Sequence, residues 1–301
     1  MRTLKAYAEI IETRLSEIPA VVPEGRCEIG EMPWLLSQSM RYSLCAGGKR
    51  LRPSMLLAAV EMMGGSIEEA LDFACAVEMI HTYSLIHDDL PGMDDDTLRR
   101  GRPTNHVVFG VGQAILAGDG LLNCAFETML EAAARNPERA VESLAAIREI
   151  ARGAGVTGMI AGQVMDLHCE RNRVQDRAAL DYIQYGKTAC MFIYPLRAAV
   201  RLCGGEEAAL RALTEYGRAF GLLFQATDDL LDVIGDAGSV GKTLGKDAES
   251  GKLTCISAYG LEGTRALVES LHADARRAIE PFGEKGAFFA GLVDDMAGRT
   301  M

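Results

Sequence analysis

The sequence has no long apolar run, no paired cysteines and no zinc-type spacing of histidine. None of its apolar stretches approaches the roughly 18 residues that a membrane-spanning helix needs, so we expect no membrane span. The first residues include Glu9 and Glu12 and lack the apolar core of a signal peptide. We therefore expect a protein that is not secreted.

The eight cysteines are scattered without a C-x-x-C pair, and most stand among apolar neighbours, as small core residues do. The five histidines form neither an H-E-x-x-H motif nor a Cys/His zinc pattern, and no G-x-S-x-G nucleophile motif occurs. These absences predict a reduced, cytoplasmic protein without disulfides or structural zinc. A net charge of −11 disfavours nucleic acid and anionic membranes as partners, because both need a broad basic surface.

Strand signals are also missing, and helical periodicity dominates. Ser66 and Glu69 form a capping box that begins a helix ending near Asp89, where Pro91-Gly92 stops it. Several predicted helices have about 20 residues, or ~30 Å at ~1.5 Å per residue. Without a linker or repeat, the sequence predicts one all-α domain over residues 1–301. Further helix stops are expected at Asn136-Pro137, Gly153-Ala154-Gly155, Gly204-Gly205 and Gly235.

Two acidic clusters follow long apolar segments. Four polar residues share one helix face at positions i, i+3, i+4 and i+7: Gln225, Asp228, Asp229 and Asp232. Their apolar neighbours argue against a solvated acidic face, so the carboxylates need a cation. The other cluster begins with Asp88 and Asp89, and Pro91-Gly92 frees the backbone to bring Asp94 back toward Asp88. Such oxygen ligands suit Mg²⁺, whereas imidazole or thiolate would indicate zinc or iron.

Basic residues complete the pattern. The stretch 47–53, Gly-Gly-Lys-Arg-Leu-Arg-Pro, puts three cations near a helix start, where backbone N–H groups also favour an anion. Arg99 and Arg100 directly follow the first acidic cluster, and Lys187 stands in a mostly apolar helix, where a charge is costly unless paired. The segment 238–252 contains three Gly-Lys pairs and is predicted to be a loop. Its backbone N–H groups and lysine ammonium groups can close over phosphates. Taken separately, each is typical of a surface cation; together they predict a site for two diphosphates.

These motifs resemble those of the trans-isoprenyl diphosphate synthases, or polyprenyl synthetases. The stretch 88–101 resembles the family's first aspartate-rich motif, DDxxxxD followed by RRG, and 228–232 resembles the second, DDxxD. The stretch 47–53, Lys187-Thr188, Gln225 and the glycine-lysine loop also match in order. Chance alone does not readily produce so many matches in the same order.

The resemblance spans residues 35–262 and implies a fold of long antiparallel helices around a central cavity, assembled as a homodimer. It implies a magnesium-dependent prenyltransferase that joins isopentenyl diphosphate head-to-tail to an allylic diphosphate. Three Mg²⁺ ions per active site are implied, with direct ligands from Asp88, Asp94 and Asp228. Supporting carboxylates would come from Asp89, Asp229, Asp232 and Asp247.

The resemblance also assigns the cations. Arg99, Lys187 and Lys242 would grip the allylic diphosphate. The groups implied to hold isopentenyl diphosphate are Lys49, Arg52, His81 and Arg100. After the C–O bond ionises, the regions of Lys187-Thr188 and Gln225, with main-chain carbonyls, would stabilise the allylic cation until the double bond of isopentenyl diphosphate attacks it. The chain departs from the bacterial members at Leu244 and Cys255, where those members often have a small residue and an aromatic, respectively.

Tyr83 suggests the product length. It lies five residues before Asp88, about 7.5 Å deeper along the helix at ~1.5 Å per residue, where its ring would block a growing tail. This aromatic, next to Ser84 and with the Pro-Gly insertion, resembles bacterial farnesyl diphosphate (C15) synthases, so we favour a C15 product. The alternative is geranylgeranyl diphosphate (C20), with Tyr83 as an ordinary core aromatic.

Other classes are less favoured. A terpene cyclase or a squalene-type synthase would not need the second DDxxD motif together with the 47–53 stretch. A non-catalytic partner subunit would be expected to lose charged site residues, and here all are present.

Overall fold

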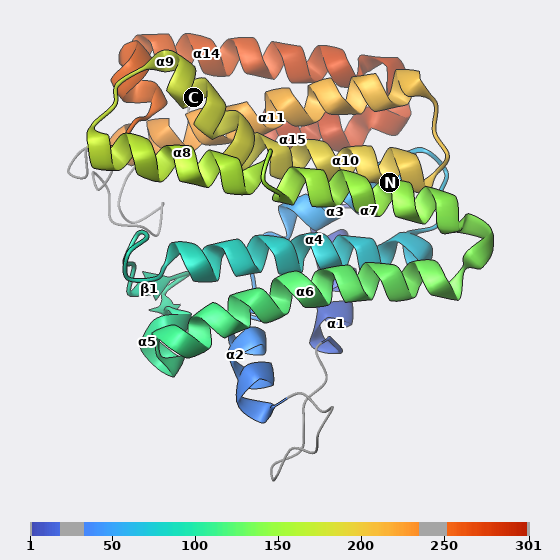
Figure 1. Ribbon diagram of the computed structural model, residues 1–301. Helices are drawn as coiled ribbons and strands as arrows, with labels where there is room; N and C mark the ends of the chain where they lie inside the picture. Colours follow the sequence, from blue (N-terminus) through green and yellow to red (C-terminus); the bar gives the residue numbers. More distant parts are fainter. Residues whose placement is uncertain (1, 19–32, 235–251, 300–301) are drawn as a thin grey trace. The chain divides into compact units, whose positions relative to one another are not determined.

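The computed structural model describes residues 2–18, 33–234 and 252–299 (Figure 1). Its contacts divide the chain into two compact units. The N-terminal unit comprises Arg2–Val60 and Ser66–Ile147, and the C-terminal unit comprises Glu61–Gly65 and Arg148–Met301. The expected all-α class is confirmed, because the described elements are helices apart from two short strands. None of the described helices has the length and apolarity of a membrane span.

The N-terminal unit is built around α4 and α6, which lie side by side (Figure 1). The Ser66 hydroxyl caps α4 by accepting the N–H of Glu69 at 3.3 Å, which is the Ser66 half of the predicted capping box. In α1 the buried residues are Tyr7, Ile11 and Leu15, which share a face at four-residue spacing. The helices that begin in this unit are α1 Leu4–Ser16, α2 Trp34–Leu44, α3 Leu51–Met62, α4 Ile67–Asp88, α5 Asn105–Phe109, α6 Val111–Arg135, η1 Pro137–Arg139 and α7 Ala140–Ala154.

A two-stranded hairpin follows α4. Its strands, β1 Leu98–Arg99 and β2 Arg102–Pro103, pair antiparallel around the two-residue loop Arg100-Gly101. Both loop residues have positive φ, 53° and 74°, as a type I′ hairpin turn requires. The sequence predicts no strand here, because strands of two residues are too short to show an alternating pattern.

The C-terminal unit packs α10, α11 and α14 together (Figure 1). Stacked rings of Tyr216 and Phe220 lie 5.8 Å apart in its core, and the Tyr216 hydroxyl donates to the carbonyl of Phe289 at 2.7 Å. The predicted stops near Asn136 and Gly204 fall within two residues of the ends of α6 and α10. The elements of this unit are α8 Met159–Asn172, α9 Arg177–Ile183, η2 Gln184–Ala189, α10 Cys190–Leu202, α11 Glu207–Ile234, α14 Cys255–Ile279, η3 Glu280–Gly286 and α15 Ala287–Ala297.

Two glycines let α8 and η2 touch backbone to backbone. A Cβ on Gly162 would lie 2.1 Å from the backbone nitrogen of Lys187, and one on Gly186 would lie 2.9 Å from the Cα of Gly162. The segment η2 is a π-helix, a wider turn that often occurs at functional sites. The contact therefore places the backbone of Lys187 directly against α8.

The change Gly162→Ala should lower the free energy of unfolding by about 3 kcal/mol, because the added methyl meets backbone that can move only with the whole helix. Urea unfolding measures this. The matched control is Gly291→Ala in α15, where an added Cβ meets nothing within 4 Å. It should stabilise the protein by up to about 1 kcal/mol. Equal effects of the two changes would contradict the close contact.

Candidate active site

In the C-terminal unit, one hydrogen-bonded network joins several predicted site residues. The Thr188 hydroxyl donates to Oε1 of Gln225 at 3.2 Å, and Nε2 of Gln225 donates to Oδ1 of Asp229 at 2.8 Å. The other carboxylate oxygen of Asp229 accepts the backbone N–H of Cys255 at 2.7 Å. Asp229 is thus buried and links α11 to the first residue of α14.

The other two carboxylates of this cluster, Asp228 and Asp232, are more open to solvent than Asp229. Asp228 and Asp232 are half-buried, and the Arg299 guanidinium lies 3.8 Å from Oδ1 of Asp228. Their partly open positions suit metal ligation, and the engaged position of Asp229 suits a supporting role. The ligand assignments themselves stay predictions.

Lys187 has a partner that the sequence analysis missed. Its ammonium lies 2.7 Å from Oδ2 of Asp166, which is buried in α8. Asp166 stands four residues after Gly162, so it shares the face of α8 that touches η2. The sequence does contain a clue to this pair. A lysine in an apolar segment needs a carboxylate partner, and Asp166 in α8 is such a carboxylate.

In the N-terminal unit, the first acidic cluster folds back as predicted. Helix α4 ends at Asp88, and the backbone N–H of Asp94 donates to the carbonyl of Asp88 at 2.8 Å. Gly92, with a φ of 103°, allows the reversal. The Pro91-Gly92 break therefore brings Asp94 back to the end of α4.

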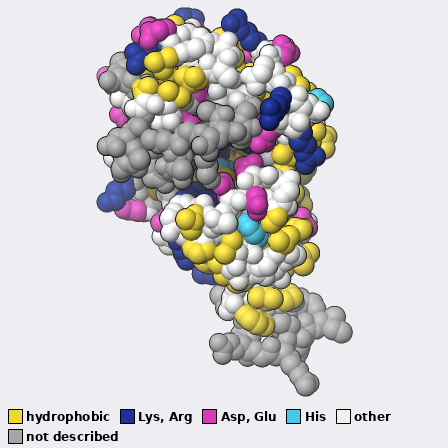
Figure 2. All heavy atoms as spheres, turned by 90° about the vertical axis from the view of Figure 1, so that its left-hand side faces the viewer, with side chains coloured by type: hydrophobic (Ala, Val, Ile, Leu, Met, Phe, Trp, Pro, Cys, Tyr) yellow, Lys and Arg dark blue, Asp and Glu magenta, His cyan; other side chains and the backbone are white. Residues whose placement is uncertain are grey.

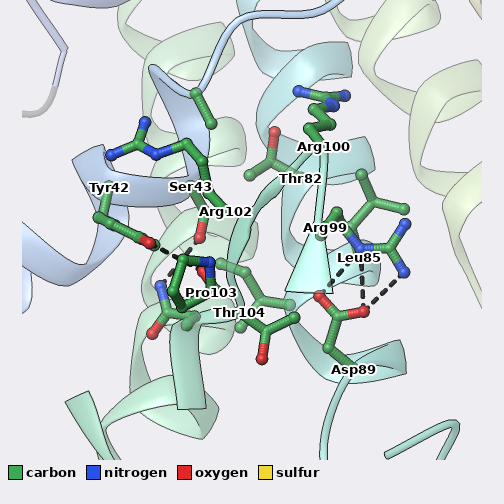
Figure 3. Close-up of a pocket in the computed structure, with 13 residues that line it drawn as sticks. Tyr42, Ser43, Thr82, Leu85, Asp89, Arg99, Arg100, Arg102, Pro103 and Thr104 are labelled. Atoms are coloured by element: carbon green, nitrogen blue, oxygen red, sulfur yellow. Dashed lines mark hydrogen bonds and ion pairs between the residues drawn. The ribbon is translucent and has the colours of Figure 1, made fainter. Parts of the chain in front are cut away.

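Asp89 is buried and clamped by Arg99 of β1 (Figure 3). The Arg99 Nε lies 2.9 Å from both carboxylate oxygens, and Nη2 lies 2.6 Å from Oδ1. Burial alone would lower the pKa of Arg99, but the ion pair with Asp89 outweighs it and the pKa is raised. Burial also raises the pKa of Asp89, and the two-pronged contact with Arg99 opposes that rise.

The predicted isopentenyl diphosphate residues gather around the loop at 47–50. Arg100 donates to the carbonyl of Gly47, and Nη1 of Arg52 lies 3.4 Å from Nε2 of His81. Lys49 is exposed in the same loop. Burial, with Arg52 and Arg100 nearby, lowers the pKa of His81 well below its usual range. His81 is therefore neutral and accepts the hydrogen bond from Arg52.

A pocket opens beside the Asp89–Arg99 pair, between α2, α4 and the hairpin (Figure 3). Thr82 and Leu85 line it from α4, and Tyr42 lines it from α2. Arg99 and Arg100 leave the hairpin in different directions, as Figure 3 shows. As a result, the two predicted diphosphate-binding arginines have different partners. Arg99 binds the Asp89 carboxylate, and Arg100 binds the Gly47 carbonyl.

The two predicted chain-length residues lie on different sides of α4. The Tyr83 ring is buried and meets His87 edge-on at 5.7 Å, and the His87 imidazole contacts the carbonyl of Ile115 in α6 at 3.1 Å. Ser84 is half-buried one turn before Asp88. Burial raises the pKa of Tyr83 to about 12. Tyr83 is thus packed as a core aromatic, and Ser84 shares the face of Asp88.

The clustered carboxylates are oxygen donors, the kind of ligand that magnesium takes. Among the described residues, no three His, Cys, Asp or Glu side chains converge as a preformed metal site. Magnesium takes one or two protein carboxylates and completes its octahedron with water and phosphate oxygens. Asp88 with Asp94, and Asp228 with Asp232, offer such donors. Lys242, Asp247 and the loop at 238–251 lie outside the described residues.

A family model for polyprenyl synthetases matches residues 33–280. The chain belongs to the polyprenyl synthetase family. It is 44% identical over 269 residues to a chloroplastic geranylgeranyl pyrophosphate synthase from Capsicum annuum, a match covering 89% of this chain and 72% of that protein. A dimethylallyltranstransferase from Fischerella ambigua is 42% identical over 268 residues, covering 89% and 77%.

Solved structures of the family have the same fold. An FPP/GFPP synthase from Zymomonas mobilis superposes with a TM-score of 0.84 at 32% identity, covering 98% of this chain and 97% of that one. A geranyltransferase from Legionella pneumophila gives 0.85 at 27% identity, covering 99% and 96%. This chain is accordingly a prenyltransferase with an isoprenoid synthase fold.

The change Asp166→Asn should lower kcat/KM for the allylic substrate about tenfold or more, because Lys187 loses the charge that holds its ammonium. Steady-state kinetics measure this. The matched control is Glu149→Gln, a buried carboxylate of the same unit paired with Arg197 at 2.8 Å. It should lose stability and keep kcat/KM. The same kinetic loss in both variants would argue against a specific role for Asp166.

Proposed function

We propose that this prenyltransferase is magnesium-dependent and makes geranylgeranyl diphosphate (C20) from isopentenyl diphosphate and an allylic diphosphate. The gathering of Arg52, His81 and Arg100 around one loop carries the proposal, since a cyclase has no second diphosphate to hold. The C20 product is supported by the relatives named geranylgeranyl pyrophosphate synthases, at 44% and 45% identity in Capsicum annuum and Arabidopsis thaliana.

The residues would divide the work by unit. In the N-terminal unit, Lys49, Arg52 and Arg100 would hold isopentenyl diphosphate through charge, while neutral His81 orients Arg52. In the C-terminal unit, Lys187 would grip the allylic diphosphate from a position set by Asp166. Asp88 and Asp94 in the N-terminal unit, and Asp228 in the C-terminal unit, would each hold magnesium, which would supply positive charge to neutralise a leaving diphosphate.

The reaction needs no protein nucleophile. The C–O bond of the allylic substrate breaks, the double bond of isopentenyl diphosphate attacks the cation, and the departing diphosphate accepts the lost proton. The Thr188 hydroxyl donates a hydrogen bond to Gln225. The lone pairs of its oxygen therefore point away from Gln225. Those lone pairs would stabilise the allylic cation while it lasts.

A farnesyl (C15) product is the second candidate, favoured by the aromatic ring at Tyr83. The packing of that ring against His87 weakens this candidate, because a stopper must meet the growing tail. Ser84, on the Asp88 face, is small enough to leave room for a longer chain.

Incubation of the purified protein with Mg²⁺, isopentenyl diphosphate and each allylic primer in turn tests the product. We expect dimethylallyl, geranyl and farnesyl diphosphates all to be extended, and chromatography of the dephosphorylated products to show C20 alcohol. A product that stops at C15 in the wild type and lengthens in Tyr83→Ala would establish the second candidate. No prenyl product from any primer would refute both.

We further propose that the chain forms a homodimer through an apolar patch on α5 and the first turns of α6. Figure 2 faces this end of the molecule and shows apolar side chains at its surface. Val108 and Leu116 are 47% and 57% exposed there, and Val107, Val111 and Ile115 are similarly open. A patch of this kind marks an interaction surface.

Sedimentation velocity should therefore show a dimer, and Leu116→Glu should shift it toward monomer, because a buried unpaired charge opposes association. Leu130→Glu, exposed at the opposite end of α6, is the control and should leave the dimer intact. A monomeric wild type would contradict the proposal.

A further inference from the structure

The stretch 47–53 contains a third cation that the proposed function does not use. The Arg50 side chain turns inward and is 1% exposed, with Nη1 at 2.5 Å from Oε1 of Glu78 on α4, itself 3% exposed. Nη2 of Arg50 also donates to the carbonyl of Leu44 at 2.7 Å. Through these two buried interactions, Arg50 connects the loop to the last residue of α2 and to α4.

The backbone of this loop is unusual. Arg50 has a φ of 47°, a left-handed conformation that is uncommon for residues other than glycine, and it follows Gly47 and Gly48 with φ of 78° and 138°. Such conformations persist where surrounding contacts hold them, and they cluster at functional sites. The holding contacts include the pair with Glu78, the bond from Arg50 to the Leu44 carbonyl and a longer contact of Arg50 with Glu12 at 3.4 Å. The Arg100 bond to the Gly47 carbonyl holds the start of the loop.

The pair joins the two segments that carry three of the predicted isopentenyl diphosphate residues. Lys49 and Arg52 flank Arg50 in sequence, and His81 follows Glu78 by three residues, nearly one turn of α4. The ion pair thus ties the segment that carries Lys49 and Arg52 to the helix that carries His81. Because the two buried charges cancel, Glu78 adds little repulsion toward an incoming diphosphate.

We infer that Arg50 and Glu78 are positioning residues for isopentenyl diphosphate, holding Lys49 and Arg52 in register with His81. The inference rests on the proposed function. Breaking the pair releases the loop, so the affinity for isopentenyl diphosphate falls. The allylic diphosphate depends on Arg99 and Lys187, which have carboxylate partners of their own, so its KM changes little.

The test is Glu78→Gln, which keeps the shape of the side chain and removes its charge. We expect the KM for isopentenyl diphosphate to rise about tenfold or more, with little change in the KM for the allylic primer. Glu78→Asp keeps the charge and should restore part of the loss. An unchanged KM for isopentenyl diphosphate in folded Glu78→Gln would overturn the inference.

The matched control is Asp72→Asn. Asp72 is also buried on α4, and its carboxylate pairs with Arg14 at 2.8 Å and with Arg135. This variant should have a lower Tm and an unchanged KM for both substrates. If Asp72→Asn raises the KM for isopentenyl diphosphate as much as Glu78→Gln does, the effect is general loosening of α4 and the inference fails.

A second variant covers the case in which Glu78→Gln does not fold. The double change Arg50→Met, Glu78→Met replaces the pair with apolar side chains, a kind of exchange that proteins often tolerate. It should fold and show the raised KM for isopentenyl diphosphate; a wild-type KM would overturn the inference. An inactive wild type refutes the proposed function, whereas an active wild type with these KM values unchanged refutes only the positioning role.

Discussion

An ionised carboxylate that is buried without a partner costs several kcal/mol, and the described part of this chain buries six acidic side chains. Each of them meets a donor. Arginines pair with Asp72, Glu78, Asp89 and Glu149, a lysine pairs with Asp166, and an amide and a backbone N–H satisfy Asp229. Since every pairing fixes two side chains, the need to neutralise buried charge also sets the positions of the site residues.

The consequences are clearest where one partner is buried and the other reaches toward solvent. Asp166 is buried, whereas the Lys187 side chain is 22% exposed, so the carboxylate fixes the ammonium group of a side chain that is still partly open to solvent. Arg99, 31% exposed against 4% for Asp89, has the same arrangement. Asp166 lies within α8, and Asp89 directly follows the last residue of α4. The cations are thus oriented before any diphosphate arrives, which lowers the entropy cost of binding it.

The sequence was informative where a local rule decides the structure. The Ser66 cap, the helix stops at Asn136 and Gly204, and the return of Asp94 after Pro91-Gly92 all follow from residues close together in the chain. The sequence did not predict the features that depend on contacts between separate elements. The π-turn at 184–189 depends on the backbone of a separate helix, α8, and no periodicity within the turn reveals it.

The inward turn of Arg50 was missed for the same reason. In the sequence it is one of three equivalent cations in the stretch 47–53, and only the position of Glu78 on α4 distinguishes it from Lys49 and Arg52. The hairpin at 98–103 likewise depends on what its arginines bind after folding, the buried Asp89 and the Gly47 carbonyl. Long-range partners, which no single segment encodes, account for these misses.

The two Asp-Asp pairs repeat one physical solution. Neighbouring residues on a helix point about 100° apart, so two consecutive aspartates cannot face the same environment. In both pairs the second aspartate, Asp89 or Asp229, is buried and fully bonded, and the first, Asp88 or Asp228, is half-buried. The buried member anchors the end of its helix to a hairpin arginine or to the start of α14. The half-buried member, held by that anchor, is the one left in a position to bind a cation, so the doubled aspartate combines a structural clamp with a candidate metal ligand.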